Sequence, residues 1–191
     1  MLNKPFFQKL QKEYTDYTNA RHEIIKISSD ALRMSKQAIF ALHREEQKTA
    51  GDLILGVESI FKELSKKFKT DKRLQYEGAY KAAVEEYVES KLFYQFLKTE
   101  KIAVISEVKV DLEGYLGGLC DFTGELVRRA VKLATNKNYE EIKKYAQVTD
   151  RVISELIQFN LTKILRNKYD QTTRNLKKLE EILYDLSLRI K

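Results

Sequence analysis

The feature that most constrains this chain is its shortage of residues that interrupt helices. It contains one proline and seven glycines among 191 residues, and four of the glycines fall between residues 114 and 124. Turns between strands are usually built on glycine and proline, and the chain has too few of these residues to form the turns of a many-stranded sheet. Apolar residues recur at helical spacing over long stretches instead. The sequence therefore predicts an all-α fold of long helices.

The apolar spacing predicts where these helices lie. The first runs over residues 6–47 without interruption and is too long to be buried within one small domain, so several helices or a second subunit must pack against it. Residues 49–52 predict a break, with Asp52 capping the next helix. Further helices are expected over residues 52–68, 70–97, 111–136, 139–159 and 162–188, with a mixed connection and a brief helix over 98–110. No repeat or linker divides residues 1–191, which we expect to form a single domain.

Charge and cysteine content narrow the class of protein. The formal net charge of +7 is compatible with binding a polyanion, although many lysine-rich proteins carry as much without doing so. No apolar run reaches the roughly 20 residues of a membrane span, and the amino terminus lacks the apolar core of a signal peptide. We therefore expect a cytoplasmic protein with no membrane partner. The single Cys120 excludes an internal disulfide and a cysteine-based zinc cluster.

The stretch GYLGGLCDFTGELVRRAVK, residues 114–132, has an unusual polar face. At about 100° per residue, one stripe collects the four glycines together with Asp121, Glu125, Arg128 and Lys132. Glycine costs roughly 1 kcal/mol against alanine inside a helix, so four on one face indicate that another helix or a nucleic-acid backbone approaches closely. Asp121 and Glu125 are four residues apart and repel each other. A bound cation would reverse the sign of that interaction.

The segment EEYVE, residues 85–89, places two more carboxylates on a helix that is apolar nearly all round. Glu86 and Glu89 share one stripe there, where they are costly unless paired, protonated or bound to metal. The alternative is a surface stripe with a salt bridge from Lys81 to Glu85. With the acids of residues 121 and 125, they would supply hard oxygen ligands from two helices, the type that Mg²⁺ or Mn²⁺ prefers.

Other common chemistries lack their motifs. No G-x-S-x-G or phosphate-binding G-x-x-x-x-G-K-[ST] sequence occurs, which argues against serine hydrolases and nucleotide triphosphatases. The two histidines, His22 and His43, both lie in the first predicted helix and are expected to pack or hydrogen-bond rather than to catalyse. The Glu-x-x-His motif of di-iron bundles is missing as well.

Four segments carry a resemblance to a known family. They are ARHEIIKISSDALRMSKQAIFALHR (residues 20–44), EEYVE (85–89), EGYLGGLCDFTGELVRRAV (113–131) and LRNKYDQTTRNLKKLEEILYDLSLR (165–189). In this order they resemble the translin superfamily, and compact, archaeal-type members of its translin-associated factor X branch more than translin itself. The resemblance implies a bundle of about seven helices with a long N-terminal helix. It also implies assembly into an octameric shell that encloses single-stranded RNA or DNA.

The resemblance further implies an active site. In translin-associated factor X the shell is a metal-dependent endoribonuclease whose acids lie in E-Y-V-E and D-L-T-G-E segments. The matching residues, as catalytic groups and as ligands of Mg²⁺ or Mn²⁺, are Glu86, Glu89, Asp121 and Glu125. Phe122 replaces the leucine of the second segment, and Gly78 stands where a basic residue is common. Translin lacks this acid set and mainly binds nucleic acid, so retention of all four acids favours an active subunit.

Three basic residues are candidates for binding nucleic acid. Arg128 is placed to stabilise the scissile phosphate, Lys132 to guide the strand, and Lys81 to add a further contact. A salt-bridge network with the same acids would explain Arg128 and Lys132 equally well. Arg129 lies on another side of the helix and is expected to be solvated or at an interface.

Two other functions stay open at this point. A non-catalytic single-stranded RNA- or DNA-binding protein, like translin, predicts salt-sensitive binding without metal-dependent turnover. A purely structural helical oligomer predicts no affinity for nucleic acid. The octamer could consist of this chain alone or include a translin-type subunit.

Overall fold

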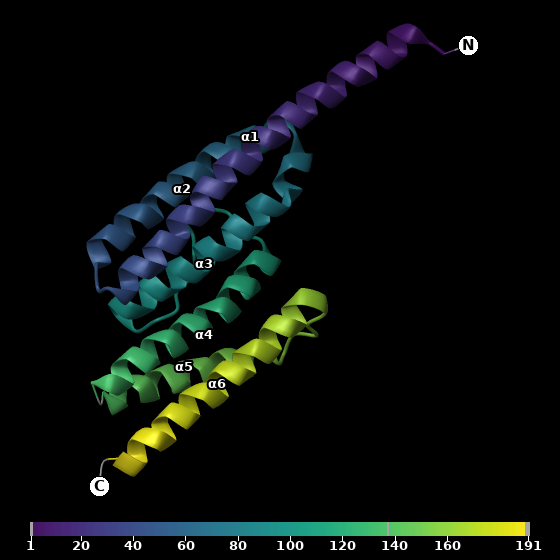
Figure 1. Cartoon of the computed structure of the whole chain (residues 1–191). Helices are drawn as coiled ribbons and strands as arrows, with labels where there is room; N and C mark the ends of the chain where they lie inside the picture. Colours follow the sequence, from purple (N-terminus) through teal and green to yellow (C-terminus); the bar gives the residue numbers. More distant parts are fainter. Residues whose placement is uncertain (1, 137, 190–191) are drawn as a thin grey trace.

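The computed structural model describes residues 2–136 and 138–189, and within them the chain forms six α-helices, one short 3-10 helix and no strand (Figure 1). The elements are α1 (Lys4–His43), α2 (Gln47–Thr70), η1 (Lys72–Tyr76), α3 (Gly78–Thr99), α4 (Leu112–Thr135), α5 (Tyr139–Leu156) and α6 (Lys163–Arg189). The predicted all-α class is confirmed. The long N-terminal helix has 40 residues, and the expected count of about seven is reached when η1 is included.

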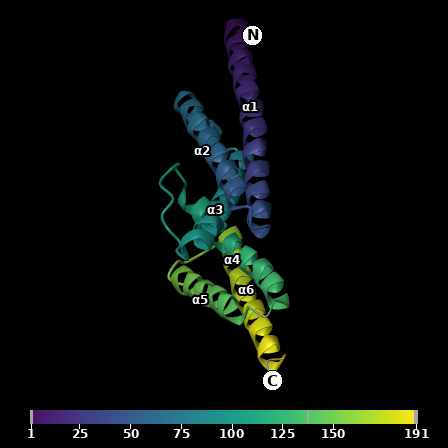
Figure 2. The ribbon, with the colours of Figure 1, turned by 90° about the vertical axis from the view of Figure 1, so that its left-hand side faces the viewer.

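The helices form two groups that meet where α3 packs on α4 (Figure 1). In the first group α1 packs against both α2 and α3, and in the second α4, α5 and α6 pack against one another. The first part of α1 projects beyond the other helices in both views (Figures 1 and 2), and residues 2–16 are exposed. Within the described ranges, none of the helices combines the length and apolarity needed to cross a membrane.

Several predicted boundaries differ from the structure, among them the end of α5, which lies at Leu156 instead of 159. The first break lies at residues 44–46, where Glu45 has a φ of 67°, and residues 49–52 with Asp52 are inside α2. Gly51 therefore serves packing instead of a turn, since a Cβ there would lie 3.2 Å from the hydroxyl oxygen of Tyr94. The helix predicted over 70–97 begins only at Gly78, because η1 occupies its first part; the N-cap of η1, Asp71, accepts a hydrogen bond from the backbone N–H of Arg73. The brief helix expected within 98–110 is wrong, because residues 98 and 99 end α3 and residues 100–110 are irregular.

The central helix α3 is largely buried, as its all-round apolar pattern predicts. It also carries a buried ion pair. The ammonium nitrogen of Lys91 lies 2.8 Å from a carboxylate oxygen of Glu58 on α2 and 2.7 Å from one of Glu107 in the connection to α4. The hydroxyl of Tyr87 donates to the same oxygen of Glu58 at 3.0 Å. These contacts fasten α2 and the α3–α4 connection to one side of α3, which leaves its other side to face α4.

Glycines allow α3 and α4 to approach closely. A Cβ on Gly118 would lie 2.6 Å from the Cβ of Val88 and 2.7 Å from the backbone oxygen of Glu85, and a Cβ on Gly117 would collide with the carboxylate of Glu85. The neighbour that the glycine stripe predicts is therefore helix α3. Gly124 differs, since a Cβ there would meet only the amide nitrogen of Asn175 on α6, at an ordinary 3.7 Å.

Candidate functional site

The four acids singled out in the sequence come together at the α3–α4 contact. Glu86 and Glu89 project from α3, Asp121 and Glu125 from α4, and all four side chains are half-buried. Burial, followed by the negative charges of the other three acids, raises the pKa of Glu89 to about 9. Glu89 is therefore protonated at neutral pH unless a cation binds beside it. The pKa of Glu86 is also raised, chiefly by burial, while the cation of Lys36 opposes the shift.

Helix α6 adds a lysine to this cluster. The ammonium nitrogen of Lys168 lies 2.5 Å from a carboxylate oxygen of Asp121 and 3.1 Å from one of Glu85. Glu85 thereby becomes a fifth carboxylate of the cluster, and the alternative salt bridge from Lys81 to Glu85 is wrong. Lys81 instead pairs with Glu113 at 3.6 Å. Lys81 has no ion pair with the acids of the cluster within the described residues.

Helix α1 forms a further wall of the site, which the sequence analysis missed. Lys36, Phe40 and His43 are spaced four and three residues apart, so they share one face of α1. The ammonium nitrogen of Lys36 lies 3.8 Å from a carboxylate oxygen of Glu86, and Nε2 of His43 is in hydrogen-bond contact with Glu125. The hydrogen-bonding role expected for the histidines thus applies to His43, but its partner is one of the site acids. His22, in contrast, is exposed.

Arg128 stands at the rim of the cluster. A guanidinium nitrogen of Arg128 lies 3.5 Å from a carboxylate oxygen of Glu125, and its guanidinium carbon lies 4.7 Å from the centre of the Phe40 ring. Its side chain is 47% exposed, so part of the guanidinium group faces solvent. Arg128 therefore forms the salt bridge with a site acid that the alternative predicted. Its exposed N–H groups are still available to bind a ligand.

The other two basic residues of α4 have structural partners. The ammonium nitrogen of Lys132 donates to the backbone oxygen of His43 at 3.0 Å, so it caps the end of α1 instead of joining the acids. Of the two roles expected for Arg129, solvation or an interface, solvation is wrong. Its side chain is half-buried and donates to the hydroxyl of Tyr145 at 3.1 Å and to the backbone oxygen of Leu42 at 3.4 Å. Arg129 thus ties α4 to α5 and α1.

The site contains carboxylates that could bind a metal ion, but they are not arranged as a metal-binding group. Within residues 2–136 and 138–189, no three His, Cys, Asp or Glu side chains are arranged as a metal-binding group. Three of the acids lie next to a cation instead, with Lys36 beside Glu86, Lys168 beside Asp121 and Arg128 beside Glu125. The donor set still fits Mg²⁺ or Mn²⁺ in its chemistry, because half-buried carboxylates from two rigid helices are hard oxygen ligands.

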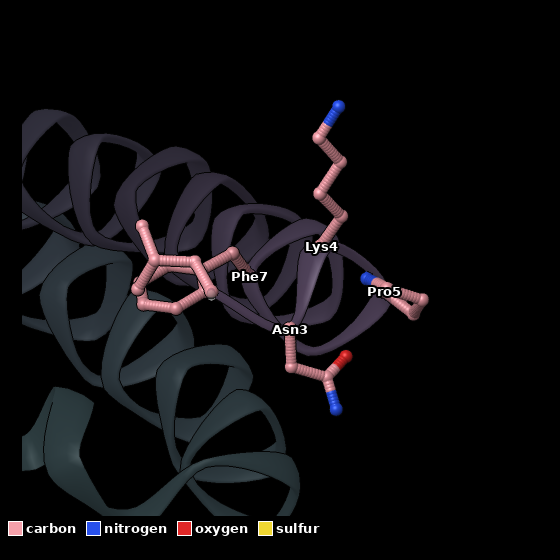
Figure 3. Close-up of a pocket in the computed structure, with 5 residues that line it drawn as sticks. Asn3, Lys4, Pro5 and Phe7 are labelled. Carbon is pink, nitrogen blue, oxygen red and sulfur yellow. The ribbon is translucent and has the colours of Figure 1, made fainter.

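A hollow at the start of α1 does not share these features. It is lined by Leu2, Asn3, Lys4, Pro5 and Phe7 and lies at the end of the projecting part of α1 (Figure 3). None of these residues is acidic or nucleophilic. Asn3 accepts a hydrogen bond from the backbone N–H of Phe6 at 3.2 Å, which is the N-cap of α1. The acid cluster is therefore the candidate functional site.

Known sequences similar to this chain share one family. The Translin family profile matches residues 19–190. Translin of Gallus gallus is 26% identical over 148 residues, which cover 70% of this chain and 65% of that protein. Translin-associated protein X of Mus musculus is 26% identical over 169 residues, which cover 65% of this chain and 58% of that protein. The chain thus spans less than two thirds of the length of these two relatives.

Solved structures similar to this chain have the same fold over nearly the whole length. The crystal structure of apo-NeC3PO has a TM-score of 0.87 and 26% sequence identity, and covers 97% of this chain and 98% of its own. The structure of an AfC3PO–duplex RNA complex has a TM-score of 0.83 and 18% identity, and covers 96% of this chain and 97% of its own. At 18% identity, the similarity to AfC3PO shows a shared fold and nothing more.

Proposed function

Since this chain belongs to the translin family, we propose that it is a subunit of a Mg²⁺- or Mn²⁺-dependent endoribonuclease that cuts single-stranded RNA. The observation that carries the proposal is the convergence of four carboxylates from α3 and α4, with the pKa of Glu89 raised to about 9. Acids that serve only stability are usually paired with cations. Glu89 has no ion pair within the described residues, and an unpaired carboxyl among three others is typical of a functional site.

The residues of the cluster have distinct roles in this proposal. Glu86, Glu89, Asp121 and Glu125 would hold one or two divalent ions. A bound ion would lower the pKa of a water molecule and neutralise charge that develops on the scissile phosphate. Glu89, which is protonated at neutral pH unless a cation binds beside it, must release its proton to act as a ligand.

Basic side chains would prepare the site for an anionic substrate. Lys36 and Lys168 offset part of the negative charge of the acids, so that a phosphodiester can approach them. Arg128 can direct its exposed guanidinium donors to a phosphate oxygen while it keeps its contact with Glu125. Lys132 and Lys81 would act farther along the strand, since neither pairs with the acids of the cluster.

The proposal includes an oligomeric shell, an octamer of this chain alone or of this chain with a translin-type subunit. Support comes from the fold shared with the apo-NeC3PO structure and from the surface of α1. The projecting part of α1 exposes Phe6, Phe7, Leu10 and Tyr14. A row of large apolar side chains on a protruding helix is typical of a subunit contact. Binding of nucleic acid belongs to the proposal as well, and the duplex RNA in the AfC3PO complex is a property of that protein.

The test is cleavage of end-labelled single-stranded RNA with Mg²⁺ or Mn²⁺, compared with EDTA. The isosteric variants Glu86→Gln, Glu89→Gln and Asp121→Asn should each lower the cleavage rate by about 100-fold or more, because each removes one charged ligand. The matched control is Glu113→Gln, which changes an exposed acid whose ion pair among the described residues is with Lys81. Variants that cut as fast as the parent would contradict the proposed site. A mass near the 22.4 kDa monomer in light scattering would contradict the shell.

One observation favours the non-catalytic alternative, in which the protein only binds single-stranded RNA or DNA. The described residues contain no preassembled metal-binding group, and three of the four acids lie beside cations. Under this alternative the parent binds nucleic acid in a salt-sensitive manner and shows no divalent-ion-dependent turnover. A gel mobility-shift measurement beside the cleavage assay separates the two functions.

A further inference from the structure

An exposed aromatic ring stands at the edge of the acid cluster. Phe40 is 51% exposed, although its neighbours in α1, Ala38, Ile39, Ala41 and Leu42, are buried. It lies on the same face of α1 as Lys36 and His43, which contact Glu86 and Glu125. The ring therefore points away from the core and lies between two residues that touch the site acids.

Arg128 connects this ring to the acids. Its guanidinium group lies over the Phe40 ring, 4.7 Å from the ring centre, and also contacts Glu125 at 3.5 Å. The cation covers part of the ring and leaves half of the side chain open to solvent. A ligand that covers the exposed part of this ring would gain the hydrophobic free energy that the monomer forgoes.

The chemistry of this pair suits a nucleobase. Bases stack on aromatic side chains and on the planar guanidinium group of arginine, and the stacking does not depend on the sequence. Only the side chain of Arg128 lies between the Phe40 ring and Glu125, since it contacts both. This spacing is similar to that in a nucleotide, where one sugar lies between the base and the phosphate. A strand with a phosphate at the acids can thus place an adjacent base on the ring.

We infer that Phe40 and Arg128 form a base-stacking subsite beside the acid cluster, which binds an unpaired base next to the phosphate held at the acids. The inference rests on the proposed function, because it assumes that nucleic acid reaches this site. The subsite selects single strands. In a duplex both faces of each base are covered by its neighbours, so a paired strand cannot use the ring without unstacking.

The test is binding of fluorescently labelled RNA by Phe40→Leu, measured by anisotropy in EDTA at fixed salt, where Lys36, Lys168 and Arg128 remain to attract the phosphate beside the acids. Loss of an aromatic ring on which a base stacks lowers the affinity for the nucleic acid by about 5- to 100-fold. We expect a loss in this range for single-stranded RNA and unchanged affinity for an RNA duplex. Phe40→Trp keeps an aromatic face and should bind single strands at least as tightly as the parent.

Two controls isolate the stacking contribution. An oligomer of the same length and charge that lacks its bases should bind the parent and Phe40→Leu equally, because only the phosphates remain. Tyr184→Leu removes another exposed aromatic ring, on α6, and should leave single-strand affinity unchanged. Equal affinity of the parent and Phe40→Leu for single-stranded RNA overturns the inference. So does an equal loss on the base-free oligomer, or a change of mass in light scattering, which would make Phe40 a subunit contact.

The outcome is separate from that of the nuclease proposal. Binding is measured without divalent ions, so a parent that binds RNA but never cleaves it ends the nuclease proposal and leaves the stacking measurement valid. A Phe40→Leu variant that binds like the parent ends the inference and leaves the nuclease proposal in place. A parent that binds no nucleic acid refutes both.

Discussion

Two glycines of α4 should respond in opposite ways to the same substitution. Gly118 faces α3, where a Cβ would lie 2.6 Å from the Cβ of Val88 and 2.7 Å from the backbone oxygen of Glu85. Neither atom can move away alone, since one belongs to a β-branched side chain and the other to the backbone of α3. Gly124 faces α6, where a Cβ would make an ordinary contact of 3.7 Å with Asn175.

The expected magnitudes follow from two opposing contributions. Replacing glycine by alanine inside a helix stabilises it by about 1 kcal/mol. For Gly124→Ala this gain stands alone, so the variant should be more stable by about 1 kcal/mol. For Gly118→Ala the forced separation of α3 and α4 costs about 3 kcal/mol, the upper end for an overpacked contact, because the backbone itself must shift. The net effect is a loss of about 2 kcal/mol.

The assay is thermal unfolding followed by circular dichroism at one fixed protein concentration, since an oligomer has a concentration-dependent midpoint. For a chain of this size 1 kcal/mol corresponds to about 2–4 °C. Tm should therefore fall by about 4–8 °C in Gly118→Ala and rise by about 2–4 °C in Gly124→Ala. A Gly118→Ala variant as stable as the parent would show that the helices need no close approach there. A fall in both variants would show that the reasoning about Gly124 is wrong.

Two further predictions concern the charges of the site. Because the pKa of Glu89 is higher in the folded state, its protonation contributes fully to stability below the unfolded pKa of about 4.5, and this contribution is lost as the pH rises toward about 9. In EDTA the Tm of Glu89→Gln should therefore exceed that of the parent by a margin that grows from pH 5 to pH 9. A margin that stays constant over this range would contradict the prediction. Lys168→Met removes the cation beside Asp121 and Glu85, so calorimetric titration with Mn²⁺ should show several-fold tighter binding, whereas Lys178→Met, an exposed lysine farther along α6, should match the parent. Unchanged or weaker affinity of Lys168→Met would refute the competition.

The helices were predictable because their signals are local. The apolar spacing indicated the long helix α1, and Asp111 and Asn138 accept the N-cap hydrogen bonds of α4 and α5 close to the predicted starts. The wrong boundary at residues 49–52 has a specific cause. Glycine often interrupts a helix, so Gly51 indicated a break. In the structure its lack of a side chain makes room for Tyr94, and a contact between residues so far apart in the chain cannot be inferred from the local sequence.

The site was predictable only in part, for the same physical reason. Glu86 and Glu89, and likewise Asp121 and Glu125, share helix faces, so their spacing indicated pairs of acids. Lys168 lies 47 residues from Asp121 along the chain, and His43 lies 82 residues from Glu125. Spacing within a helix carries no information about such partners.

The cations around the acids offset part of the repulsion within the cluster. Each cation comes from a different part of the chain: Lys36 from α1, Lys168 from α6 and Arg128 from α4 itself. The cluster therefore depends on contacts between both groups of helices, and it forms only when α1 and α6 are docked on the α3–α4 pair. Glu89 has no such ion pair within the described residues, and by keeping its proton it avoids both the cost of a buried charge and the repulsion of the other acids. A divalent ion would have to release that proton and compete with the neighbouring lysines, so its affinity should rise with pH and when Lys168 is removed.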